Sequence, residues 1–108
     1  MAYSFQQDVP ITMDVYRKVL DGLGPTPAEG LIVHMAIQLE HGLRYIDVWE
    51  SQELHERFVE DRLHAVVGDV LRGEGFEQMP PEPKMVSLDV RDVWLPAVAT
   101  GRPVDPLQ

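Results

Sequence analysis

Residues 31–58, LIVHMAIQLEHGLRYIDVWESQELHERF, contain the pattern that decides the fold. Alternate positions from Leu31 to Leu39 are apolar, which predicts a strand because successive side chains of a strand point to opposite faces. The turn at residues 41–42 contains a glycine, and the segment 43–49 then predicts the returning strand of a hairpin. Ser51 predicts the N-cap of a helix that follows the hairpin directly.

The segment before this stretch predicts one more strand and one more helix. Residues 2–9 alternate between apolar and polar side chains, as expected of a strand that Pro10 ends. Thr12 can accept a hydrogen bond from the first free amides of a helix, and apolar residues then recur at helical spacing. Gly22 and Gly24 end this helix.

The segment after Ser51 completes the order of elements. Apolar positions recur at helical spacing as far as Leu71, with a kink or break expected around residues 61–64. Gly73 predicts the end of this helix, and a proline-containing connection leads into a last predicted strand over residues 84–93.

The resulting order is strand, helix, strand, strand, helix, strand, which is the split βαβ pattern of ferredoxin-like domains. The predicted fold class is therefore α+β, with a four-stranded antiparallel sheet and two helices on one face. We expect this domain to span residues 1–94 and to be followed by a proline-containing tail over residues 95–108.

Composition restricts the classes of partner. The net charge of -9 and the scattered basic residues disfavour nucleic acid and anionic membranes as partners. The absence of cysteine excludes disulfides and thiolate metal sites. No leader pattern and no apolar segment of about 20 residues is recognisable, so we expect a cytoplasmic protein.

The register of the hairpin is predicted by bringing the apolar positions of both strands onto one face. Pairing Met35 with Val48 achieves this, and we expect that apolar face to meet the helices. The other face, predicted to be free of helices, then carries a set of polar and aromatic side chains. They are His34, Gln38, Tyr45, Asp47 and Trp49 from the hairpin and Ser87, Asp89 and Arg91 from the last strand.

Aromatic residues beside polar groups are typical of interfaces and ligand sites. The sequence therefore predicts that the helix-free face packs on a second subunit, lines a small-molecule cavity, or does both.

Residues 47–58, DVWESQELHERF, resemble the junction between strand and helix in the dimeric α+β barrel superfamily. The closest likeness is to the antibiotic-biosynthesis-monooxygenase-like proteins, whose junctions carry a tryptophan, a serine cap and an acidic first turn. The order of elements extends this likeness over roughly residues 2–94.

The resemblance implies a homodimer whose two sheets pack through their helix-free faces to form a barrel with a cavity in each subunit. It also implies cofactor-independent oxygenation of aromatic polyketide-like substrates or, in another branch, heme degradation. Both activities resemble systems that use an asparagine near the cavity, and this chain contains no asparagine. Trp49 matches a cavity tryptophan, whereas His55 is not assigned as the helix histidine that holds heme.

A cofactor-free oxygenase needs a base, an oriented substrate and a dry cavity. His34 is the natural base, because an unperturbed imidazole titrates near pH 6.5. Asp47 or Asp89 can hold its orientation, and Tyr45 or Arg91 can stabilise a phenolate. Each role has a structural alternative: packing for His34, a core position for Trp49, and an ion pair with a nearby aspartate for Arg91.

The histidines do not predict a metal site. His55 and His64 do not lie one turn apart on one helical face, and His41 lies in a turn. We therefore expect neither a metal nor a cofactor.

Three functions stay open from the sequence. The first is a small-molecule-binding homodimer with a small aromatic or carboxylated ligand beside Trp49, His34 and Tyr45. The second is a cofactor-independent monooxygenase with an aromatic substrate. The third is a structural dimer module whose cavity its own side chains fill, so the sequence leaves the question of enzymatic activity open.

Overall fold

The computed structural model of the 108-residue chain describes residues 2–76 and 83–94. The predicted tail over residues 95–108 and most of the proline-containing connection lie outside these residues. The elements, in chain order, are β1 (Tyr3–Val9), α1 (Met13–Leu23), β2 (Leu31–Gln38), β3 (Leu43–Trp49), α2 (Gln52–Phe58), η1 (Val59–Leu63), α3 (His64–Gly73) and β4 (Met85–Ser87).

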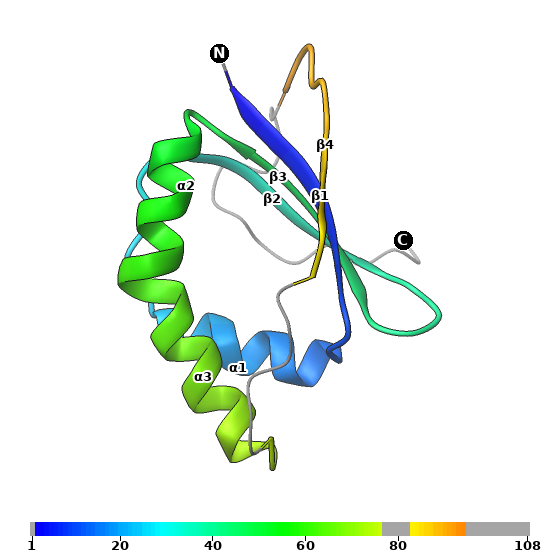
Figure 1. Cartoon of the computed structure of the whole chain (residues 1–108), viewed down its shortest axis with the longest axis vertical. Helices are drawn as coiled ribbons and strands as arrows, with labels where there is room; N and C mark the ends of the chain where they lie inside the picture. The colour runs from blue at the N-terminus through cyan, green and yellow to red at the C-terminus, as the bar shows by residue number, and fades with distance from the viewer. Residues whose placement is uncertain (1, 77–82, 95–108) are drawn as a thin grey trace.

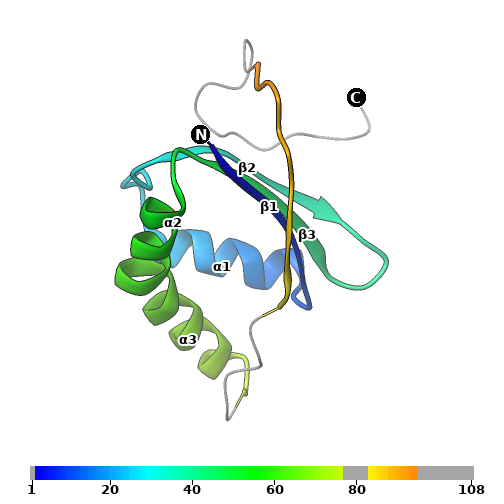
Figure 2. The same ribbon diagram turned by 45° about the horizontal axis from the view of Figure 1, so that its top comes forward.

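The four strands form one antiparallel sheet in the order β2-β3-β1-β4. Helices α1, α2 and α3 lie on the same side of this sheet (Figure 1). A second view shows the same two layers, with α1 running beneath the strands (Figure 2). The predicted α+β class and the ferredoxin-like βαββαβ order are thus confirmed.

The predicted helix starts are confirmed by their caps. The hydroxyl of Thr12 accepts a hydrogen bond from the amide of Val15 at 3.2 Å. The hydroxyl of Ser51 accepts one from the amide of Leu54, also at 3.2 Å. Each cap satisfies one of the backbone donors that the first turn of a helix leaves without an intrahelical partner.

The break predicted in the second helix is a π-helical turn, η1, which joins α2 to α3. Within it, Arg62 donates hydrogen bonds to the carbonyl oxygens of Leu23, Thr26 and Pro27 at 3.2, 2.8 and 3.0 Å. Carbonyls at the end of a helix lack intrahelical donors, so this guanidinium ties η1 to the carboxyl end of α1 and to the loop that follows it.

The hairpin register differs from the prediction by two residues. His34 pairs with Asp47, Met35 with Ile46 and Ala36 with Tyr45. A slip of two residues leaves every side chain on its original face, so the criterion of matched apolar faces cannot detect it.

The prediction that the polar face is free of helices is wrong. His34 reaches Tyr16 of α1, and the ring of Trp49 packs against His55 and Phe58 of the second helix. Because residues two apart in a strand share a face, the polar set of β2 and β3 lies between the sheet and the helices. We call this side of the sheet the inner face.

The helix-free face is the apolar one. It carries Met35 and Ile37 of β2 and Val86 of β4, which are 45%, 39% and 50% exposed. Among the described residues, the ion pair on this face joins Asp8 to Arg44, at 2.8 Å. We call this helix-free side the outer sheet face. It is largely apolar, and the opposite charges of Asp8 and Arg44 cancel each other.

The last strand is shorter than predicted. β4 ends at Ser87, and one further backbone hydrogen bond of 3.0 Å joins the amide of Leu88 to Ser4. Asp89 and Arg91 therefore lie beyond the strand instead of within it.

Candidate functional site

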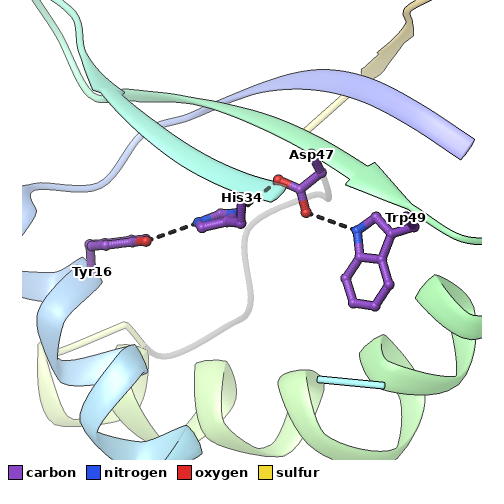
Figure 3. A network of polar contacts seen from close by, with 4 residues as sticks. All are labelled: Tyr16, His34, Asp47 and Trp49. Carbon is purple, nitrogen blue, oxygen red and sulfur yellow. Dashed lines mark hydrogen bonds and ion pairs between the residues drawn. The ribbon is translucent and has the colours of Figure 1, made fainter. Parts of the chain in front are cut away.

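A chain of hydrogen bonds crosses the inner face from α1 to β3. It joins Tyr16, His34, Asp47 and Trp49, and all four side chains point into the space between sheet and helices (Figure 3). The strand register places His34 of β2 directly beside Asp47 of β3. The period of two along β3 then brings Trp49 to the same face as Asp47.

The carboxylate fixes the tautomer of the imidazole. Nδ1 of His34 lies 2.7 Å from Oδ1 of Asp47. An ionised carboxylate only accepts hydrogen bonds, so Nδ1 carries the proton. In the neutral imidazole Nε2 is then an acceptor, and the hydroxyl of Tyr16 donates to it at 2.9 Å.

Asp47 is held by partners on both of its oxygens. Its second oxygen accepts a hydrogen bond of 3.0 Å from the indole nitrogen of Trp49. The side chains of Asp47 and His34 are 10% and 23% exposed. A buried carboxylate is stable only when hydrogen bonds replace its lost water, and these two donors supply them.

Tyr45 completes the site as a third ring. It packs edge-on against His34 with ring centroids 4.9 Å apart and lies 5.7 Å from the ring of Tyr16. Burial raises the pKa of Tyr45 above its usual value, and the nearby Tyr16 and Asp47 raise it further. Burial, followed by the charge of Asp47, likewise raises the pKa of Tyr16. Both phenols therefore stay protonated and act as hydrogen-bond donors near neutral pH.

This arrangement resembles, in its roles, other sites in which a carboxylate orients an imidazole towards a hydroxyl group. The carboxylate fixes the ring and stabilises the imidazolium that forms when Nε2 takes a proton. The site is thus suited to bind an acidic hydroxyl group and to accept its proton.

Three of the other predicted site residues lie apart from the network. The amide of Gln38 donates to the carbonyls of Leu39 and Gly42, so it stabilises the hairpin turn. Arg91 and Asp89 form an ion pair with each other at 2.8 Å, and their side chains are 85% and 75% exposed. The structure thus realises the ion-pair alternative for Arg91.

Trp49 is 1% exposed and is a core residue as well as a member of the network. Its indole lies in an aromatic cluster that also contains Tyr3, Phe5, His55 and Phe58. His55 is buried in this cluster, with ring centroids 4.8 Å from Phe5 and 5.1 Å from Trp49.

The sequence reasoning missed Tyr16 as a site residue and treated it as one of the apolar positions of the first helix. The available signal was a hydroxyl on the apolar stripe of a helix that had to cover a strand bearing a histidine. A buried tyrosine hydroxyl needs a hydrogen-bond partner, and in the fold His34 supplies it.

A hollow of about 460 Å³ lies at the amino end of α1. Its lining includes Met13 of α1, Gln38 of β2 and the hairpin turn at residues 40–42. Met13 lies one turn before Tyr16 on the helix, and Gln38 shares the inner face with His34. The hollow therefore lies on the same two elements, α1 and β2, that carry Tyr16 and His34, although neither of these two residues lines it.

No group of three metal-ligating side chains lies together among the described residues. Comparison of the chain with protein-family models, curated proteins and solved structures gives no significant match. Within the ranges 2–76 and 83–94, no helix is long and apolar enough to cross a bilayer.

Proposed function

We propose that this chain is a small-molecule-binding homodimer whose ligand site lies on the inner face around His34, Asp47 and Tyr45. The observation that carries the proposal is the partly buried His34–Asp47 pair, because it supplies an oriented acceptor in a protected position. A purely structural core would be more stable with apolar side chains there, since a buried charge needs compensating partners.

Exposed apolar residues on the inner layer support the same proposal. Leu20 lies one turn after Tyr16 on α1, yet it is 44% exposed. Met85 pairs with Gln7 on the inner face of the sheet and is 37% exposed. Apolar surface beside a few oriented polar groups is the usual lining of a small-molecule site, and it suits an aromatic or other largely apolar ligand.

A second candidate function is cofactor-independent oxygenation of an aromatic substrate, in keeping with the resemblance of residues 47–58. The oriented imidazole favours it, because such a reaction begins with removal of a proton from an acidic substrate. The neutral phenol of Tyr45 packs beside His34 and can donate a hydrogen bond to the resulting anion. The purely structural dimer module is the third reading, and it predicts no ligand uptake.

We expect the purified protein to bind an anthrone or a hydroquinone, and His34→Ala to weaken this binding. If the protein is an oxygenase, it will also consume oxygen with these compounds. Loss of the base should then lower the rate by about a hundredfold or more. Binding is measured by fluorescence or calorimetry and the reaction by an oxygen electrode.

His64→Ala is the matched control, because His64 is exposed on α3, away from the network. Equal binding and equal rates in the two alanine variants would show that His34 has neither role. Absence of any uptake would instead favour the structural module.

The homodimer is proposed to form through the outer sheet face. This face exposes Met35, Ile37 and Val86, and its one described ion pair is neutral overall, although the chain carries a net charge of -9. Two strongly acidic molecules associate best through surfaces that bring no like charges together. Stable interfaces of this kind bury about 1,200 to 2,000 Å² in total.

We expect sedimentation or light scattering to give a mass near twice the 12.2 kDa of the chain. Met35→Glu should shift the protein to the monomer, because it places two buried charges at the interface. Ala65→Glu adds the same charge on the exposed surface of α3 and should leave the dimer intact. A monomeric parent protein, or a dimer that tolerates both substitutions equally, would contradict this interface.

A further inference from the structure

The acceptor nitrogen of the candidate base is already occupied by a side chain of the same protein. Nδ1 of His34 is committed to Asp47, so Nε2 is the only ring atom that a ligand can use as an acceptor. Tyr16 holds that atom at 2.9 Å, and the two rings are nearly parallel, with an interplanar angle of 14°. A ligand that uses His34 must therefore displace the Tyr16 hydroxyl.

The two ends of α1 are held differently. At its carboxyl end, Arg62 binds the carbonyl of Leu23, and a side-chain carbon on Gly22 would lie 2.6 Å from Val66 of α3. This close approach fixes that end against α3. Towards its amino end, the hydrogen bond from Tyr16 to His34 joins α1 to the sheet. In the described chain, that part of the helix also borders the hollow, at Met13.

We propose that Tyr16 is a gate, and that a ligand hydroxyl entering from the hollow replaces its phenol on Nε2 of His34. This inference rests on the proposed ligand site. It adds the route by which the ligand enters, the residue that moves to admit it, and the functional group that the ligand must carry. That group is a hydrogen-bond donor, because in the neutral imidazole the Nδ1 proton is donated to Asp47 and Nε2 is the acceptor. The amino-terminal turns of α1 move outward, while the end beside Gly22 and Arg62 is the pivot.

The first test opens the gate permanently. Tyr16→Ala keeps a good helix former and removes a phenol-sized group next to His34. The probe is p-cresol, which has the shape and hydroxyl of the missing side chain, and toluene is its counterpart without the hydroxyl.

We expect Tyr16→Ala to bind p-cresol at least about tenfold more tightly than the parent protein and more tightly than toluene. NMR signals of the His34 ring should shift when p-cresol is added. The preference for p-cresol over toluene should disappear in the double variant Tyr16→Ala, His34→Ala. Equal binding of the two probes to Tyr16→Ala, or an unchanged His34 signal, would overturn the gate.

The second test uses Tyr16→Phe, which removes only the hydroxyl oxygen and creates no cavity for a probe molecule. Without the hydrogen bond to His34, Tyr16→Phe should open more often, by about fivefold, which is the typical worth of one such bond. The rate at which diethyl pyrocarbonate modifies His34, located by mass spectrometry of peptides, should rise by the same factor. Tyr3→Phe removes a phenol hydroxyl from another cluster of the inner layer and should leave that rate unchanged. An unchanged rate in Tyr16→Phe would contradict the gate.

The gate and the proposed function can fail separately. If Tyr16→Phe raises the modification rate of His34 but the parent protein takes up no ligand, Tyr16 opens as proposed and the small-molecule function fails. If the parent protein binds a ligand through His34 while Tyr16→Phe changes neither affinity nor modification rate, the function stands and the gate fails.

Discussion

Replacing Trp49 by alanine is expected to lower the free energy of unfolding by about 3 to 5 kcal/mol. Trp49 is 1% exposed and packs against His55 and Phe58, so the substitution leaves a large cavity in the core. It also removes the indole donor from the buried carboxylate of Asp47. Since domains of this size are stable by only about 5 to 15 kcal/mol, this variant should be at the edge of unfolding.

Trp49→Phe separates packing from hydrogen bonding, because it keeps an aromatic ring and removes the indole nitrogen. Urea denaturation should place it between the parent protein and Trp49→Ala. A loss of less than about 1 kcal/mol in Trp49→Ala would mean that the aromatic cluster is not a core in solution.

Alkaline pH is expected to destabilise the protein through its buried tyrosines. Burial raises the pKa of Tyr16 and of Tyr45 above the ordinary value of 10.0. Above pH 10.0 the unfolded chain therefore loses phenol protons that the folded chain still holds. The stabilisation is complete below that pH and is lost as pH rises towards the folded-state pKa, by up to about 1.4 kcal/mol per pH unit for each tyrosine.

Denaturation at several pH values, with phenolate absorbance recorded in parallel, measures this effect. Tyr45→Phe should flatten the pH dependence above pH 10.0 because it removes one of the phenols with a raised pKa. Tyr3 also has a raised pKa, mainly through burial, but it is less buried and should ionise first in the folded chain. If all three phenols ionised together near the ordinary value, the inner layer would be open to water.

The element order could be predicted from local signals because each one has a local cause. Thr12 and Ser51 satisfy amides of the turn that follows them. Gly42 has a φ of 91°, and a side-chain carbon there would lie 2.4 Å from the carbonyl oxygen of Val9. Such positions require particular residues whatever the rest of the chain does, so the sequence records them directly.

The orientation of the sheet could not be predicted in this way. The expectation that its more apolar face is buried fails here because the polar side chains of the other face satisfy one another. His34 needs Asp47 from the neighbouring strand and Tyr16 from a helix, and both contacts arise only after folding. The apolar residues Met35 and Ile37 meanwhile remain on the outer face, where the proposed second subunit would cover them.

The candidate site was predicted in composition more than in geometry. His34, Tyr45, Asp47 and Trp49 do lie together, because alternation along two paired strands fixes which residues share a face. Asp89 and Arg91 were assigned to that face on the assumption of a strand longer than β4. Where a strand ends depends on its pairing partner, and the pattern of residues 84–93 does not contain that information.

The π-helical turn Val59–Leu63 accommodates one additional residue within the second helix. Such a turn holds about one residue more than an α-helical turn, and each α-helical residue rotates the following helix by about 100°. The additional residue is therefore absorbed locally, which allows His55 on one side and Leu71 on the other both to be buried. A related chain could lack one residue here, form a continuous α-helix, and still present the same inward stripe to the sheet.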